Sequence, residues 1–566
     1  MFKSLTNWVF TPSKKPIRKA AKPKSVQLAV ERLEQRDLMA TLIPINYNAI
    51  LSITPSITLV GSTIKIQGSS GNDHAVIFPP DEGIPSFHVS VQYKNFLNSE
   101  PQIMSLSVRE PVTDITFVGG SGNDTVINLT SIPMNASGGS GIDRLVGGSR
   151  HDTLDGGTEG DTLEGGGGND TLIGGNGSDK LYGGFLGQPI DSSATAPSLI
   201  LPDWWVNLYP GSIDVVDLNR RLNDGDDTLL GGSNDDRLEG GTGDDHLNGG
   251  SGYDRLYGGG GDDVLISLDG QAIDYVDGGV GRDTIWADPR SGLPFIDETI
   301  VSDSSDKVHR VSGFANTADR TLDGDRITDP TIKAGQSYKT FAGNPLFSTT
   351  GPSMMDGRQG ALNDSWLIAG LGAIVNRIKQ NVVDFDDGTY GVHLGDKFYR
   401  VDNDLAVASS TSTAPVYAQV GAENSMWVAV VEKAYAHYRT GANSYASLEG
   451  GWAGDVNTAF GLTATIQSLQ SFGSSAAMAN ELLRLSFICN VTIGSITSAA
   501  GTPLENGLDY IFHSVTRNAS GVVTSITLRN PRGVDGINTD VNPFDGLVTV
   551  TPDQLFQSMG SLTRPA

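Results

Sequence analysis

Residues 138–146 read Gly138-Gly139-Ser140-Gly141-Ile142-Asp143-Arg144-Leu145-Val146, a nonapeptide that recurs through the middle of this 566-residue chain. Its pattern is G-G-x-G-x-D-x-U-x, in which U is a large apolar residue. The aspartate returns every nine residues in two blocks, and a leucine follows each aspartate by two positions. These aspartates are Asp143, Asp152, Asp161, Asp170 and Asp179, then Asp227, Asp236, Asp245, Asp254 and Asp263. A flexible linker has no reason to keep that leucine in phase, so the pattern predicts ordered structure.

The repeat predicts a parallel β-solenoid. Glycines allow positive φ angles and the close stacking of turns, and the leucines of short strands point inward. Two nonapeptides make one coil, so the aspartates form two rows. Carboxylates stacked about 4.8 Å apart repel one another, and hard oxygen donors favour Ca²⁺ as the ion between them. Asp274 and Asp283 continue the pattern after a slip of two residues, and outlying copies surround Asp73 and Asp124.

This segment resembles the RTX, or haemolysin-type, calcium-binding repeat, a solenoid pattern. The resemblance implies that residues 119–288 bind Ca²⁺ and that their folding is coupled to the metal. Residues 185–223 interrupt the repeats with an aromatic stretch, 202–210, which we expect to pack back on the solenoid. The sequence of residues 41–118 predicts a β-rich, degenerate solenoid or cap. Residues 289–335 are expected to form a linker.

Composition limits the classes of function. The chain has 39 Lys and Arg against 65 Asp and Glu, a net charge of −26, which argues against a general nucleic-acid binder. Glycine accounts for 71 residues, so a large part of the chain is not an ordinary hydrophobic core. Because Cys489 is the one cysteine, no intrachain disulfide forms, and we expect it to be a buried core residue. The sequence contains no apolar run long enough for a transmembrane helix.

The N-terminal 40 residues differ in charge from the rest, with nine Lys or Arg against three acidic residues. Within them, Leu33-Glu34-Gln35-Arg36-Asp37-Leu38-Met39 resembles the LEPR-XLL export motif of bacterial surface and exported proteins, with Met39 at the last leucine position. The resemblance implies an exported protein at the bacterial cell surface or outside the cell, with residues 1–40 as the sorting segment.

After residue 335 the glycine pairs stop and helix-period segments appear, so 336–566 predicts an α+β domain. Three ordered motifs resemble the calpain family of cysteine peptidases. They are Gln359-Gly360-Ala361-Leu362-Asn363-Asp364-Ser365-Trp366, then Met426-Trp427-Val428 with Glu432-Lys433-Ala434-Tyr435, and Arg529-Asn530-Pro531-Arg532-Gly533. The resemblance implies the two-lobed papain-like fold. The expected architecture is therefore multidomain, a calcium β-roll followed by a papain-like domain.

The resemblance also implies catalytic positions. Gln359 matches the oxyanion glutamine, Asn530 the orienting asparagine, and Ser365 stands where the family has its nucleophilic cysteine. A serine hydroxyl is far less acidic than a thiol and needs a well-placed base. Aligned on Ser514-Val515, the histidine position holds Ile511, and His513 lies two residues later. His513 therefore acts as the base only if a β-bulge restores the register.

Three functions remain open. The first, which we favour, is a calpain-like domain that binds a peptide or protein in its cleft without cutting it. The second is an active calcium-dependent endopeptidase that uses Ser365, His513 and Asn530. The third is a calcium-stiffened surface protein with cell-surface or matrix partners, which is compatible with the first.

Overall fold

The computed structural model describes residues 55–78, 87–93, 102–108, 111–184, 225–270, 273–289, 298–316, 328–487, 490–494, 496–497, 502–533, 546–558 and 560–565. By their contacts, residues 53–566 form one compact unit. The export-like motif at 33–39, the aromatic stretch 202–210 and Cys489 lie outside the described residues, so the predictions made for them stay predictions.

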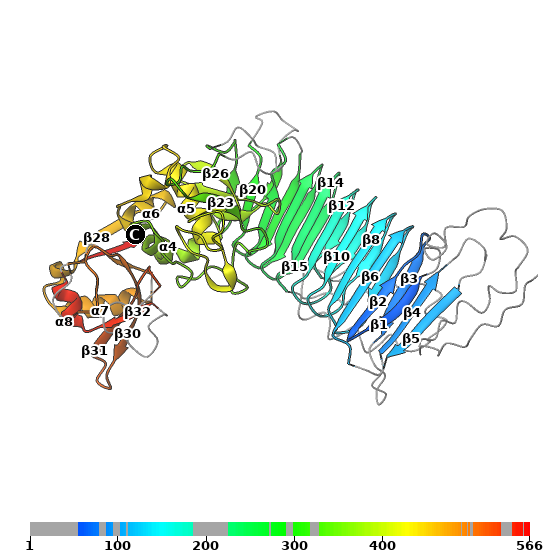
Figure 1. The fold of residues 1–566 in the computed structure, drawn as a ribbon, viewed down its shortest axis with the longest axis horizontal. Coiled ribbons are helices and arrows are strands. Elements are labelled where there is room, and N and C mark those ends of the chain that lie inside the picture. The colour runs from blue at the N-terminus through cyan, green and yellow to red at the C-terminus, as the bar shows by residue number, and fades with distance from the viewer. Residues whose placement is uncertain are drawn as a thin grey trace, which may run out of the picture. The chain divides into compact units, whose positions relative to one another are not determined.

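The predicted solenoid is confirmed as two long sheets of mainly parallel strands. The strands of each sheet lie side by side along the stack in Figure 1. The first sheet, in spatial order, consists of β1 (Ser56–Val60), β2 (Thr63–Gln67), β6 (Asp114–Ser121), β8 (Met134–Ser140), β10 (Thr153–Thr158), β12 (Thr171–Asn176), β14 (Thr228–Ser233), β16 (His246–Ser251), β18 (Val264–Ser267), β20 (Thr284–Ala287) and β22 (Lys307–Arg310).

The second sheet consists of β21 (Thr299–Val301), β19 (Tyr275–Val280), β17 (Arg255–Gly260), β15 (Arg237–Thr242), β13 (Lys180–Tyr182), β11 (Thr162–Glu164), β9 (Arg144–Val146), β7 (Thr125–Asn128), β3 (Asp73–Phe78), β4 (Phe87–Tyr93) and β5 (Gln102–Val108). Successive strands alternate between the two sheets from β6 to β22, so each pair of repeats makes one coil. The antiparallel pairs β1–β2, β3–β4 and β4–β5 lie at the N-terminal end of the stack.

The repeat leucines fill the space between the sheets. All ten, from Leu145 to Leu265, are fully buried in one apolar core. Each contributes about 2 kcal/mol through burial. The second glycine of a repeat has positive φ, as Gly157 shows at +111°, and a Cβ added there would lie 2.2 Å from the carbonyl oxygen of Gly139. Glycine is therefore required by both the conformation and the stacking.

The solenoid continues across two segments that the sequence separates from it. Strands β12 and β14 pair in register, as do β13 and β15, so the coils resume after residues 185–224 without a change of register. The assignment of 289–335 to a linker is wrong for part of its length. Strands β21 and β22 lie in that range and extend both sheets. The glycine pairs that mark earlier coils are missing there, which hid these strands from the sequence pattern.

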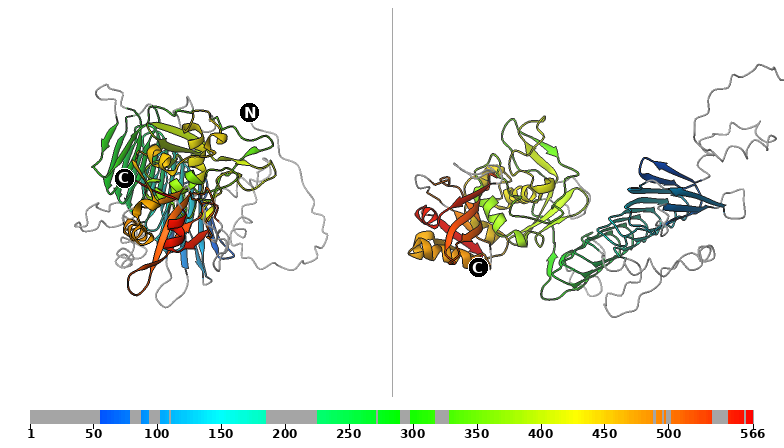
Figure 2. Two further views of the ribbon diagram at one scale, coloured as in Figure 1. Left: turned by 90° about the vertical axis from the view of Figure 1, so that its left-hand side faces the viewer. Right: turned by 90° about the horizontal axis from the view of Figure 1, so that it is seen from below.

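The C-terminal α+β domain has two separate apolar cores. Each belongs to one of two lobes, which are coloured green to yellow and orange to red in Figure 2. The first lobe contains β23 (Ser337–Thr340), α4 (Ser365–Ala373), β24 (Val382–Asp384), β25 (Thr389–Leu394), β26 (Lys397–Asp402), β27 (Asp404–Val407), α5 (Trp427–Tyr438) and α6 (Ala453–Ala459). The second contains β28 (Ala464–Ser468), α7 (Ser475–Leu485), β29 (Thr492–Gly494), β30 (Tyr510–Arg517), β31 (Val523–Arg529), β32 (Leu547–Val550), α8 (Pro552–Gln557) and β33 (Ser561–Pro565).

Candidate functional site

The repeat aspartates form two continuous rows along the solenoid. In each row, the backbone N–H of one aspartate donates to a carboxylate oxygen of the aspartate one coil further on, at 2.7 Å from Asp143 to Asp161 and 2.8 Å from Asp245 to Asp263. The first row is Asp73, Asp124, Asp143, Asp161, Asp179, Asp236, Asp254 and Asp274. The second is Asp152, Asp170, Asp227, Asp245, Asp263, Asp283 and Asp306.

All ten aspartates proposed from the repeat therefore lie in these rows, five in each. Asp306 at the end of the second row was missed by the sequence pattern. It receives the N–H of Asp283 at 3.0 Å. The residues before Asp306 are Ser304 and Ser305 rather than glycines, so no repeat signal marks it.

The second carboxylate oxygen of many row members is buried without a hydrogen-bond partner. This holds for Oδ2 of Asp124, Asp143, Asp161, Asp179, Asp236, Asp263 and Asp283. This Oδ2 atom lies next to the first glycine of its own repeat. A Cβ on Gly156 would lie 2.4 Å from Asp161 Oδ2, and one on Gly258 would lie 2.4 Å from Asp263 Oδ2. Orphaned carboxylate oxygens beside glycine turns form a donor set that fits a hard cation such as Ca²⁺.

The local electrostatics also favour a bound cation. Burial, the largest cause, raises the pKa of Asp124, Asp236, Asp254 and Asp263 to about 8, and the neighbouring acidic groups add to the effect. No group of three or more His, Cys, Asp or Glu side chains gathers around one point in the described part of the chain. A bound ion would therefore combine single carboxylates with turn carbonyls rather than occupy a cage of side chains.

These raised pKa values predict that the calcium-free solenoid is more stable at about pH 5 than at about pH 8.5. Their stabilising effect is fully present below the unfolded-state pKa near 3.8 and is lost as pH rises through the folded-state values of about 6 for Asp143 to about 8 for Asp236. Thermal unfolding of calcium-depleted full chain, followed by circular dichroism, measures this. Equal stability at the two pH values would contradict it. Because binding releases protons, calcium affinity should rise over the same range.

In the C-terminal domain, Ser365 is the first residue of α4, and it is 3% exposed. The indole Nε1 of Trp366 donates to the carbonyl oxygen of Leu448 at 3.1 Å, which fixes the start of this helix. The Oγ of Ser365 accepts a hydrogen bond from the backbone N–H of Asp509 at 3.4 Å. The residue next to the hydroxyl is therefore Asp509, which the motif comparison did not identify.

His513 lies at a β-bulge. Its neighbours Phe512 and Ser514 pair with consecutive residues of β31, so His513 is the extra residue in β30. The bulge that the sequence analysis required is present, yet His513 is exposed, and its Nδ1 lies 3.0 Å from Ser514 Oγ. Four residues at about 3.3 Å each separate it from Asp509 along the strand, whereas a general base works within about 3.2 Å. The bulge does not bring His513 to Ser365.

Ile511, which the alignment places at the histidine position, packs further along α4. Its side chain is fully buried and packs against Gly372, where an added Cβ would lie 2.3 Å from Ile511 Cδ1. Gly372 is about two turns along α4 from Ser365. Ile511 and Asp509 are two residues apart in an extended segment, so their side chains lie on the same face of it. They therefore face α4 at different positions along the helix axis. The backbone of Asp509 thus lies opposite the start of α4, and its carboxylate lies beside Gly494 of β29.

The structure brings Gln359 and Asn530 to the same turn. The N–H of Gln359 donates to the carbonyl oxygen of Pro531 at 2.7 Å, and its Nε2 donates to that of Leu362 at 2.5 Å. Asn530 is fully buried, and its Oδ1 accepts from the N–H of Arg532 at 2.9 Å. Its Nδ2 donates to Glu505 Oε1 at 3.4 Å. The asparagine oxygen that would orient a histidine is therefore engaged by the backbone.

Two charged groups near this centre are almost completely buried. Asp364, directly before Ser365, and Glu432 on α5 are each 1% exposed. Burial raises the pKa of both carboxyls, and the Asp364 carboxylate raises that of Glu432 further. Neither appeared among the sequence candidates, because a buried acid is recognised only from the packing around it.

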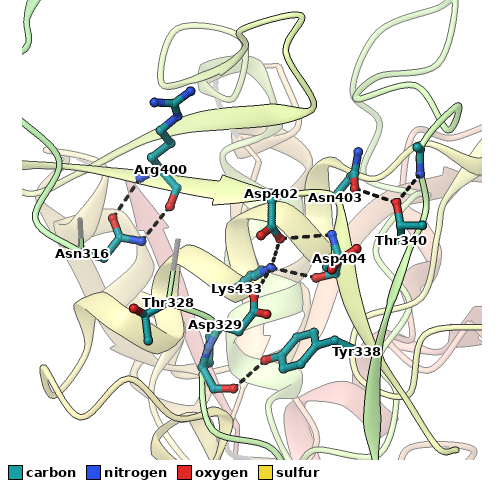
Figure 3. Close-up of polar contacts among 12 residues, drawn as sticks. Asn316, Thr328, Asp329, Tyr338, Thr340, Arg400, Asp402, Asn403, Asp404 and Lys433 are labelled. Atoms are coloured by element: carbon teal, nitrogen blue, oxygen red, sulfur yellow. Dashed lines mark hydrogen bonds and ion pairs between the residues drawn. The ribbon is translucent and has the colours of Figure 1, made fainter. Parts of the chain in front are cut away.

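Lys433 on α5 is fully buried and binds three oxygen atoms (Figure 3). Its Nζ lies 2.5 Å from Asp329 Oδ1, contacts Asp402 Oδ1, and donates to the carbonyl oxygen of Asp404 at 2.7 Å. The ammonium group therefore makes two hydrogen bonds, to Asp402 and Asp404, and one ion pair with Asp329. The cluster holds α5 against the β26–β27 turn, so its role is structural.

The comparisons with known proteins agree with this division of the chain. Residues 334–540 match the calpain family cysteine protease model. Four copies of the RTX calcium-binding nonapeptide repeat match residues 137–158, 155–185, 222–256 and 239–271. The calpain-1 catalytic subunit of Bos taurus is 27% identical over 215 residues, which cover 34% of this chain and 29% of that relative's length. In the described residues, no helix has both the length and the apolar character needed to cross a bilayer. The chain therefore carries repeats of the RTX calcium-binding type, followed by a domain that is similar to the calpain family of cysteine proteases.

Proposed function

We propose that this protein binds Ca²⁺ through its repeats and that its calpain-family domain binds peptide or protein segments in the cleft without efficient cleavage. The observation that carries the second part is the surroundings of Ser365. Its hydroxyl accepts a hydrogen bond from the backbone N–H of Asp509, whereas the Nδ1 of His513 lies beside Ser514 Oγ. A serine without an adjacent base is a poor nucleophile.

The neighbouring groups support the same proposal. Asn530 Oδ1 is engaged by Arg532, and Arg532 Nη1 is held by Glu505 Oε2 at 2.5 Å. Asn530, which the resemblance implies would orient a histidine, makes its described contacts with Arg532 and Glu505 instead. Binding needs only the scaffold, whereas hydrolysis needs the relay.

A cleavage assay on the full chain in calcium tests this proposal. We expect hydrolysis of labelled peptide libraries to be no faster with the wild-type chain than with Ser365→Ala, while fluorescence polarisation detects binding to both. The active-peptidase alternative predicts cleavage that both Ser365→Ala and His513→Ala abolish. Such cleavage would overturn the proposal.

We also propose that the protein is exported. RTX repeats are typical of secreted bacterial proteins, and residues 33–39 resemble an export motif. Fractionation of the native bacterium with an antibody against the repeats tests this. Recovery in the culture medium or at the cell surface supports export, and recovery in the cytosol contradicts it. A surface location would also permit matrix partners.

A further inference from the structure

The outer face of the first solenoid sheet carries a row of side chains that an ordinary RTX pattern does not require. We call it the outer row, and it consists of Ile173, Leu230, Asn248, Ile266, Trp286 and His309. Its members are in register on strands β12, β14, β16, β18, β20 and β22. Each follows an inward-facing core residue directly, so it points away from the solenoid core.

The C-terminal half of the outer row is covered by the peptidase domain. Ile266 and Trp286 are fully buried in a common apolar core with Val383 and Phe385, which flank the end of β24. The Trp286 ring meets Phe385 edge-on at a centroid distance of 6.0 Å and Phe398 at 5.7 Å. This core is composed of residues from both domains, so neither domain completes it alone.

Polar contacts fix the register of the same interface. Asn248 Nδ2 donates to the carbonyl oxygen of Phe385 at 3.0 Å and to Asp386 Oδ2 at 3.2 Å. His309 Nε2 lies 2.6 Å from the carbonyl oxygen of Gln380. Beyond the last coil, Asn316 makes two hydrogen bonds with the backbone of Arg400, shown in Figure 3. Buried polar pairs of this kind specify one docking arrangement.

Each residue of the outer row has a fixed sequence position relative to the second row of aspartates. Every member of the outer row lies three residues after an aspartate of the second row, as Asn248 follows Asp245, Trp286 follows Asp283 and His309 follows Asp306. The same short strand therefore carries a candidate calcium ligand at its start and an interface residue near its end. If calcium orders the turn, it also orders the strand that presents the interface residue.

On the side of the C-terminal domain, the interface is in contact with the core that contains α4. Val383 faces the common core, whereas its neighbour Val382 lies in the first-lobe core together with Leu367 and Leu371 of α4. Ser365 begins this helix. Loss of the solenoid face would expose Val383 and Phe385 and loosen the sheet that supports α4.

From this juxtaposition we propose that the repeats are the calcium sensor of the peptidase domain, because the calcium-ordered coils β16–β22 supply half of a core that the first lobe needs. The inference rests on calcium binding by the repeats. It predicts that calcium bound by the solenoid orders the first lobe through the common core.

Hydrogen exchange on the full chain, with and without Ca²⁺, tests the proposal. We expect calcium at 100 times its dissociation constant to slow exchange in residues 382–402 by about a hundredfold, together with the repeats. Trp286→Ala and Phe385→Ala should keep the calcium-induced protection of the repeats at 225–260 and reduce that of 382–402 to less than about tenfold. Leu230→Ala, in the same outer row but outside the common core, is the matched control and should behave as wild type.

The possible failures are distinguishable. Calcium-induced protection of the repeats with unchanged exchange in 382–402 would overturn the sensor proposal and leave calcium binding intact. Full protection of 382–402 in Trp286→Ala and Phe385→Ala would also overturn it. No response of either region to Ca²⁺ would overturn both the sensor proposal and calcium binding by the repeats.

Discussion

Chelation of calcium from the full chain at about pH 8 is expected to unfold the repeat region, with loss of its far-UV β signal and expansion of the molecule in solution scattering. The two rows place carboxylates at strand spacing in a buried setting, with orphaned Oδ2 atoms on Asp143, Asp161 and Asp179. At that pH most of these groups must ionise, because burial raises the pKa of Asp161 to only about 7. Without a cation, the charges repel at short range and lack water.

One substitution and its matched control test whether the rows carry this effect. Asp161→Asn removes a row carboxylate and should raise the calcium midpoint of folding roughly tenfold or more. Asp155→Asn lies on the same coil, in β10, but its side chain points away from the core and is outside both rows. It should leave the midpoint unchanged. A chain that keeps its β signal and its dimensions in EGTA would contradict the metal requirement, as would equal midpoints for the two variants.

The solenoid was largely predictable because one short-range rule specifies it. A nine-residue period fixes the turn, the inward leucine and the aspartate together, so two sheets and two rows follow from the spacing alone. This rule no longer identifies strands or row aspartates where the nine-residue period is interrupted. Asp306 and strand β22 lack the glycine pairs, and only the stacking of Lys307–Arg310 on β20 reveals them.

The peptidase domain was predictable in its elements but not in its reactive centre. The helical periods around Leu367 and Trp427 gave α4 and α5, and the hairpin at Asp386-Asp387-Gly388 joins β24 to β25. Which residue lies opposite Ser365 depends on the β-bulge in β30 and on where along the axis of α4 this strand passes. A sequence motif contains no information on either feature.

The interface between the two domains could not be predicted from the sequence either. Ile266 and Trp286 read as ordinary variable positions of the repeat, and their role depends on Phe385, which is about 100 residues further along the chain. Long-range apolar contacts leave no periodic trace in a single sequence.

Restoration of a catalytic dyad should depend on the residue opposite Ser365, and the structure identifies that residue as Asp509. We expect the Ser365→Cys/Asp509→His variant to cleave labelled peptides about 10²- to 10⁴-fold faster than Ser365→Cys alone, the usual contribution of a positioned base. A thiol at the start of α4 is acidified by the helix N-terminus and by an adjacent imidazolium. A histidine at position 509 would be attached to a backbone whose N–H already contacts the side chain at position 365.

The matched control is Ser365→Cys/Ile511→His, which the linear alignment would choose instead. Its imidazole would replace the side chain that packs against Gly372, about two turns along the helix from the thiol, so we expect no gain over Ser365→Cys. Trapping with a thiol-reactive peptide measures the same difference independently of turnover, since only an activated thiolate reacts rapidly. Rescue by Ile511→His but not by Asp509→His would show that β30 crosses α4 in the register of the alignment. It would remove the main support for an impaired centre, because the base position would then lie where the family has it.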